Sequence, residues 1–172
     1  QAAEVFANAI HDAFDVEEVA VLTGDVEVSK DFAALDLDHL FFTGSPATGK
    51  RVAAGCAERL IGCSLEPGGK NPILILRDAN LEVAAEGATR AAFSNAGQLC
   101  VSTERMLVAD EIYDQFVGRF VAHTEAMVLG PGHNWETDMG SLISADQLET
   151  VQAHVADAVA KGAKVLTGGR HR

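Results

Sequence analysis

Short apolar segments typical of buried strands alternate along this chain with longer segments whose apolar residues recur at helical spacing. The strand-like segments are residues 19–22, 39–42, 61–65, 72–76, 105–108 and 164–167. The helix-like segments are residues 5–14, 28–35, 46–60, 80–93, 110–120 and 144–159. Because parallel strands must be joined by a crossover, which is usually a helix, this alternation predicts an α/β fold with a parallel sheet.

Residues that can cap a helix precede several of the helical segments, because their side-chain oxygens can accept hydrogen bonds from the first-turn amides. These residues are Ser45, Asn80, Asp110 and Ser144. Pro46 follows Ser45 at the first helical position, where a backbone N–H is not needed. Gly162 is expected to end the last helix, and apolar stripes are expected to turn two helices inward. The stripes are Val52, Cys56 and Leu60 in one helix and Leu148, Val151, Val155 and Val159 in the other.

The composition of the 172-residue chain excludes several classes of protein. Hydrophobic residues make up 48% and only 4 Pro and 3 Cys are present, so neither a disordered chain nor a disulfide scaffold is expected. No apolar run approaches the roughly 20 residues of a membrane-spanning helix, so no membrane partner is expected. The formal net charge of −12 disfavours binding to the phosphate backbone of nucleic acids. The chain begins at Gln1 without a signal-peptide pattern, which predicts a cytoplasmic segment of a longer protein.

The most loop-like stretch of the first half is Glu-Pro-Gly-Gly-Lys at residues 66–70, after which the strand and helix pattern starts again. We therefore predict a domain boundary here, with residues 1–66 in one domain and residues 67–172 in another. The length of the chain suits one domain or two partial ones, and it is sufficient to bury a core.

Residues 41–51, with the sequence FFTGSPATGKR, combine a strand end, a glycine turn and a helix start. Such a turn points backbone N–H groups and the positive end of a helix at one place, which favours a bound phosphate. Gly44 would let a ligand approach the backbone, and Ser45 adds a hydroxyl group. The stretch nearly matches the P-loop pattern, but Arg51 stands where a Ser or Thr would hold magnesium. A P-loop-like nucleotide site and an ordinary strand-to-helix turn are both open alternatives at this point.

Two further residues are candidates for catalysis. Glu66 lies at a predicted strand end beside a flexible turn, which suits a general base, although an ordinary surface glutamate is the alternative. Cys100 ends the polar segment NAGQLC at residues 95–100, and a thiol in such a loop is a candidate nucleophile. Cys56 and Cys63 lie on a helix stripe and in a strand, where Cys usually acts as a small buried hydrophobe. The cysteines and histidines show no zinc-site spacing, so no metal is expected.

Three blocks, taken together, identify the chain by resemblance. They read TGSPATG at residues 43–49, EPGGK at residues 66–70 and NAGQLC at residues 95–100. With TDMG at residues 137–140 and Gly168-Gly169 near the end, they resemble the aldehyde dehydrogenase superfamily in order and spacing over nearly the whole chain. The sequence that leads into the second and third blocks, at residues 59–66 and 93–100, is most similar to that of succinate-semialdehyde dehydrogenases.

The resemblance implies NAD(P)-dependent oxidation of an aldehyde, such as succinic semialdehyde, to the carboxylic acid. The Cys100 thiolate would attack the aldehyde carbon, and hydride transfer to NAD or NADP would leave a thioester on Cys100. Glu66 would activate the water that hydrolyses this thioester. The residues implied to contact the cofactor are Gly44, Ser45, Thr48, Gly49 and Pro67.

The resemblance also implies part of a Rossmann-like, parallel-sheet cofactor domain for residues 1–66, part of an α/β catalytic domain for residues 67–172, and a homo-oligomer in the full-length form. Pro67 stands where the family usually has Leu, and it removes an N–H and biases Glu66 toward extended backbone. The family's oxyanion-binding Asn and its second cofactor-binding Glu are not in this chain, so we expect the chain alone to be inactive. The alternative is a non-catalytic remnant, in which Cys100 behaves like the other two cysteines.

Overall fold

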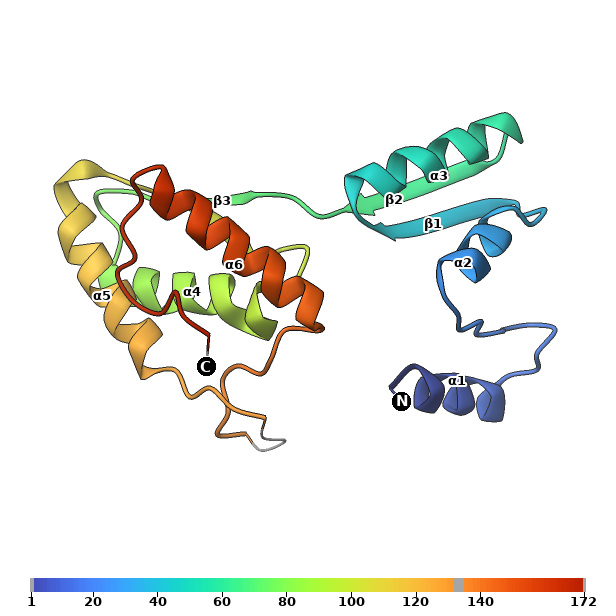
Figure 1. Cartoon of the computed structure of the whole chain (residues 1–172), viewed down its shortest axis with the longest axis horizontal. Coiled ribbons are helices and arrows are strands. Elements are labelled where there is room, and N and C mark those ends of the chain that lie inside the picture. Colours follow the sequence, from blue (N-terminus) through green and yellow to red (C-terminus); the bar gives the residue numbers. More distant parts are fainter. Residues whose placement is uncertain (1, 132–134, 172) are drawn as a thin grey trace. The chain divides into compact units, whose positions relative to one another are not determined.

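The computed structural model describes residues 2–131 and 135–171 (Figure 1). Internal contacts divide the chain into two compact units, residues 1–67 and residues 68–172. The first unit contains α1 (Ala2–Ala13), α2 (Val26–Ala33), β1 (His39–Gly44), α3 (Pro46–Glu58) and β2 (Gly62–Pro67). The second contains β3 (Asn71–Ile75), α4 (Leu81–Phe93), the 3₁₀ turn η1 (Ser94–Gly97), β4 (Thr103–Val108), the 3₁₀ turn η2 (Asp110–Ile112), α5 (Tyr113–Ala126) and α6 (Ala145–Ala160).

In the first unit, α3 connects two parallel strands, as the alternating pattern predicts. The paired residues of β1 and β2 run from His39 opposite Gly62 to Gly44 opposite Pro67. α3 lies along this strand pair (Figure 1), and its Cys56 is buried together with Leu40 of β1. Alternate residues of a strand face opposite sides, and Phe41, the neighbour of Leu40, is 68% exposed. The strand pair therefore has a covered face and an open one.

Both ends of α3 have a defined cap. Ser45 precedes the helix and its Oγ accepts the Thr48 N–H, as predicted. At the other end, the Leu60 N–H donates to Ala57 O and the Ile61 N–H donates to Cys56 O, which is the pattern of a Schellman motif. Leu60 has a φ of 57° there and is 94% exposed, so its predicted place on the inward stripe is wrong. The helix ends at Glu58, two residues too early for Leu60 to share its face.

The second unit is built on β3 and β4, which are also parallel. The register shifts at their start, since Asn71 is opposite Thr103 and Pro72 is opposite Arg105, and this leaves Glu104 as the extra residue of a bulge. Proline lacks the ladder donor, so Pro72 suits this irregularity. The core consists of Ile75, Ala85, Ala88 and Phe116. α4 packs against α5, and the rings of Phe93 of α4 and Phe120 of α5 stack there with centroids 6.0 Å apart.

Two predicted strands are not formed. Residues 19–22 and 164–167 have no regular secondary structure, and Leu22 and Leu166 are exposed. An apolar run becomes a strand only where a neighbouring strand offers its edge, and within the described residues neither segment has such a partner. The first unit therefore has two of its three predicted strands.

The predicted caps are partly confirmed. Asn80 Oδ1 accepts the N–H groups of Glu82 and Val83, and Ser144 Oγ accepts the Gln147 N–H. The prediction for Asp110 is wrong, because the chain enters α5 through η2 and Asp110 lies inside that turn rather than before the helix.

The last helix ends as predicted, but its apolar stripe is only partly covered. Gly162 follows α6 with a φ of 96°. Leu148 and Val155 are half-buried, whereas Val151 and Val159 are exposed, so the inward face predicted for α6 is wrong in half of its members. The sequence GPGHN at residues 130–134 predicts a loop; Gly130 and Pro131 form a bend, and residues 132–134 lie outside the described residues.

The α/β fold class is confirmed, because helices connect strands in two parallel pairs. Within residues 2–131 and 135–171, no helix has both the length and the apolar character needed to cross a bilayer.

Candidate active site

The turn between β1 and α3 is organised by the side chain of Ser45. Its Oγ accepts the Thr48 N–H at 3.2 Å and donates to Thr48 Oγ1 at 3.0 Å, while Ser45 O accepts the Gly49 N–H at 2.9 Å. Pro46 has no N–H. Among the described first-turn groups, the Ala47 N–H and the Thr48 hydroxyl are donors that a ligand could use, because the Ser45 hydroxyl proton is already donated to Thr48 Oγ1. The turn thus offers a small polar site at the positive end of a helix.

The strand register brings Glu66 and Pro67 to this same turn. Glu66 is opposite Thr43, and Pro67 is opposite Gly44. The carboxyl ends of parallel strands meet at one edge of a sheet, which is where α/β proteins bind their ligands. Glu66 and Pro67 are both exposed at this edge.

Gly44 and Gly49 differ in whether the structure leaves room for a side chain. A Cβ added at Gly44 would lie 2.5 Å from Cζ of Phe42, so a side chain there would displace the ring. A Cβ added at Gly49 would meet Cε1 of Phe42 at 3.6 Å, which is an ordinary contact. Only Gly44 is therefore required by the close packing of the turn.

A hollow of about 1150 Å³ lies between α2, β1 and α3 in the first unit. Apolar side chains such as Val28, Phe32 and Val52 form much of its wall. Of the residues predicted to contact a cofactor, Thr48 lines this hollow, and so does Arg51, the residue that departs from the P-loop pattern. Apolar walls with a few polar groups are typical of sites for small molecules.

Cys100 lies in the second unit, in the loop between η1 and β4, and its side chain is exposed. The turn before it is unusual, since Asn95, Ala96 and Gly97 have φ values of 52°, 56° and 72°. Left-handed backbone suits Gly and costs about 1 kcal/mol or more for a residue with a Cβ, as in Ala96. Such strain is found most often at functional sites.

Two amide side chains hold this loop. Asn71 Nδ2, at the start of β3, donates to Cys100 O at 2.7 Å and to Ser102 O at 3.0 Å. Gln98 Oε1 accepts the Ile143 N–H at 2.8 Å, and its Nε2 donates to Asn95 O at 3.0 Å. The backbone around the exposed thiol is therefore held by one side chain that is distant in sequence, Asn71, and by Gln98, which connects the loop to Ile143.

The other cysteines differ from Cys100. Cys56 is buried and Cys63 is half-buried. Loss of solvation, together with the neighbouring Cys56 thiol, raises the pKa of Cys63. Because the thiolate is the nucleophilic form, Cys63 is a poor candidate for catalysis near neutral pH.

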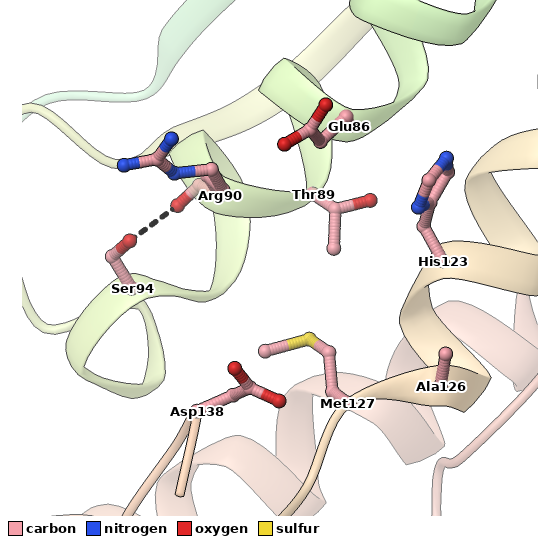
Figure 2. A pocket seen from close by; sticks show the side chains of 8 residues that line it. All are labelled: Glu86, Thr89, Arg90, Ser94, His123, Ala126, Met127 and Asp138. Atoms are coloured by element: carbon pink, nitrogen blue, oxygen red, sulfur yellow. Dashed lines mark hydrogen bonds between the residues drawn. The ribbon is translucent and has the colours of Figure 1, made fainter. Parts of the chain in front are cut away.

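A second hollow, of about 480 Å³, lies in the second unit (Figure 2). Glu86 and Arg90 from α4 and His123 from α5 line it, and Asp138 lies across from Glu86 in this view. Cys100 does not line this hollow.

The predicted site residues are thus divided between the two units. The first unit brings together the turn, Glu66 and Pro67, and the second holds Cys100. Asn71 was missed by sequence reasoning, because no local pattern indicates a hydrogen bond to a carbonyl 29 residues away. In the described part of the chain, no group of three or more His, Cys, Asp or Glu side chains is arranged to hold a metal ion.

Comparison with known proteins decides the family. The sequence model of the aldehyde dehydrogenase family matches residues 1–172. The chain belongs to the aldehyde dehydrogenase family. This agrees with the resemblance carried by the three sequence blocks.

Relatives and solved structures support this assignment. The chain is 50% identical over 153 residues to a Mycolicibacterium smegmatis protein named "Putative succinate-semialdehyde dehydrogenase [NADP(+)]", covering 89% of this chain and 30% of that protein. It is similar to betaine aldehyde dehydrogenase from Staphylococcus aureus in complex with NAD⁺, with a TM-score of 0.83, 31% identity, and coverage of 89% of this chain and 30% of the other.

A Mycobacterium tuberculosis aldehyde dehydrogenase complexed with NAD⁺ gives a TM-score of 0.83, 33% identity, and coverage of 87% and 31%. The chain therefore spans about 30% of the length of the relatives that it matches.

Proposed function

We propose that this chain carries the nucleophile, the general base and part of the cofactor site of an NAD(P)-dependent aldehyde dehydrogenase. Cys100 is the proposed nucleophile and Glu66 the proposed base. Gly44, Ser45, Thr48, Gly49 and Pro67 are proposed to contact the cofactor. Succinic semialdehyde is the proposed substrate, since relatives at about 50% identity carry that enzyme's name.

The observation that carries the proposal is an exposed thiol on a strained loop, two of whose carbonyls accept hydrogen bonds from the sequence-distant side chain of Asn71. A buried structural cysteine needs neither the exposure nor the left-handed turn. Cys56 is an internal comparison, because it has the opposite properties in the same chain.

The residues of the first unit fit a bound dinucleotide. The edge at Gly44 has no room for a side chain, and the hydroxyl groups of Ser45 and Thr48 stand at the start of α3. The apolar hollow beside Thr48 suits a planar heterocycle, and Arg51 supplies positive charge for an anionic group. NAD or NADP, when bound, supplies a hydride acceptor.

The chemistry then divides between two side chains. The sulfur of Cys100, as thiolate, adds to the aldehyde carbon and forms a thiohemiacetal. Loss of hydride from that carbon leaves a thioester on Cys100. Glu66 takes a proton from water, the resulting oxygen nucleophile attacks the thioester carbon, and the carbon–sulfur bond breaks to give the acid and the thiolate. The backbone N–H of Cys100 is proposed as one donor to the developing oxyanion.

Site-resolved thiol labelling tests the nucleophile. We expect iodoacetamide to modify Cys100 of the 172-residue chain faster than the same cysteine in a synthetic peptide of residues 97–103. Cys63 is measured by mass spectrometry in the same samples as an internal reference. If Cys100 reacts no faster than the peptide, the proposed role is wrong and a non-catalytic remnant becomes the better interpretation.

We also propose that the 172-residue chain alone does not turn over, because the family's oxyanion Asn is not in it. Formation of reduced cofactor from succinic semialdehyde would contradict this. A cytoplasmic location and a homo-oligomeric full-length protein are proposed from the resemblance, and neither enters the labelling test.

A further inference from the structure

We infer that Asn71 is a positioning residue for the Cys100 nucleophile. This inference rests on the function proposed above, because it concerns how the thiol of that reaction is held. Asn71 does not act on the substrate itself. It acts through the backbone of the loop that carries Cys100.

The hydrogen bonds of Asn71 account for this role. Its single Nδ2 group donates to two carbonyls, Cys100 O at 2.7 Å and Ser102 O at 3.0 Å. The two acceptors lie on either side of residue 101, so one amide group fixes the backbone of a three-residue segment. Ser102 is 2% exposed, which anchors one end of that segment in the protein while Cys100 faces outward.

The start of β3 makes further contacts with the same stretch of chain. The Lys70 ammonium pairs with the Glu104 carboxylate, and Arg105 Nε donates to Lys70 O at 3.1 Å. Glu104 is the extra residue of the bulge between β3 and β4, and bulges are common where a side chain must be redirected beside an active site. Asn71 therefore stands at a point where several contacts fix the path of residues 100–105.

Asn71 lies close in sequence to the proposed general base. It follows the proposed base, Glu66, by only five residues. The segment that supplies the base therefore also supplies the donor that holds the nucleophile loop. Only a donor can serve here, because both partners are carbonyl oxygens.

The test uses three variants of the 172-residue chain. Asn71→Ala removes the donor, Asn71→Asp places an acceptor in the same shape, and Asn71→Gln keeps an amide on a longer stem. The matched control is Asn80→Asp, since Asn80 accepts hydrogen bonds at the start of α4 and an aspartate can do the same. Far-UV circular dichroism shows whether each variant is folded.

Two readouts are measured. The Ser102 N–H donates to Leu99 O at 3.0 Å, so its hydrogen exchange reports whether the loop stays closed. We expect this exchange to be about five- to tenfold faster in Asn71→Ala and Asn71→Asp, as for the net loss of one hydrogen bond. The alkylation rate of Cys100 should fall toward that of the free peptide, with partial recovery in Asn71→Gln and no change in Asn80→Asp.

The outcomes separate this inference from the proposed function. If wild-type Cys100 reacts faster than the peptide but the three Asn71 variants leave both readouts unchanged, the role of Asn71 is wrong and that of Cys100 stands. If wild-type Cys100 reacts only as fast as the peptide, the proposed role of Cys100 as nucleophile is wrong. The positioning role of Asn71, which depends on it, is then wrong too. Faster exchange without any change in alkylation would make Asn71 purely structural and overturn the inference.

Discussion

Backbone strain occurs at two places in the described part of this chain, one at the end of α3 and one beside the proposed nucleophile. Leu60, Asn95 and Ala96 are the non-glycine residues with positive φ among those described. Asn95 and Ala96 precede the proposed nucleophile, where strain accompanies a precise loop shape. Leu60 ends α3, is almost fully exposed, and has no such role.

Replacing Leu60 with glycine should therefore stabilise the first unit. Glycine adopts a φ of 57° without the steric cost that leucine has, and little packing is lost at 94% exposure. We expect Leu60→Gly to raise the free energy of unfolding by about 0.5–1 kcal/mol, after the greater freedom of glycine in the unfolded chain is subtracted. Urea unfolding followed by circular dichroism measures the change.

Leu22→Gly is the matched control, because Leu22 is also exposed but is not in the left-handed region. It should be neutral or destabilising. Equal stabilisation by both variants would show that strain at Leu60 is not the cause.

At the scale of helices and strands, sequence patterns predict correctly those features whose physical cause lies in neighbouring residues. Ser45, Asn80 and Ser144 cap their helices because the acceptor and the donors are within three residues of each other. The cap predicted at Asp110 is not formed, because the 3₁₀ turn η2 contains Asp110 and precedes the start of α5. The strand predicted for residues 19–22 is not formed for a non-local reason, since a strand needs a neighbouring strand that lies elsewhere in the sequence.

The contact between α4 and α5 predicts a pH dependence. Arg119 and His123 of α5 lie 2.7 Å and 3.0 Å from the carboxylate oxygens of Glu82 in α4. Hydrogen bonds from Arg119 and then from His123 lower the pKa of Glu82 in the folded chain. The unfolded chain therefore binds more protons, so this stabilisation is present above the ordinary glutamate pKa of about 4.3 and is lost as the pH falls through the lowered value.

We expect the second unit of the wild type to lose more stability than Glu82→Gln when the pH is lowered from 7 to 3. Urea midpoints at a series of pH values measure the difference. Glu149→Gln, a matched change at an exposed glutamate of α6, should follow the wild type. Parallel pH curves for wild type and Glu82→Gln would contradict the role of this ion pair.

Across the whole chain, the buried core is small compared with the apolar surface that remains exposed. Large apolar side chains are exposed on most of the helices and strands, including Val5, Phe41, Leu74 and Val151. Monomeric soluble proteins rarely leave such apolar surface open. The chain covers about 30% of the length of its relatives, and these faces have no cover within the described residues.

The isolated chain should therefore bind the dye ANS and self-associate. Phe41→Thr should reduce both, because Phe41 lies on the open face of β1 and threonine suits a strand. Dye fluorescence and size-exclusion chromatography measure the effects. Phe116→Thr, at a position that is 1% exposed, should instead unfold the second unit and increase dye binding. No dye binding by the wild type would contradict this prediction.

The sequence by itself determined the alternating fold class, the helix starts at Ser45, Asn80 and Ser144, and the three blocks that place the chain in its family. These features depend on neighbouring residues or on fixed spacing along the chain. Tertiary structure alone decided which apolar runs became strands, that Glu66 and Pro67 stand beside the Gly44 turn, and that Asn71 holds the Cys100 loop. Those outcomes depend on strand register and on hydrogen bonds between residues far apart in sequence, which no local pattern specifies.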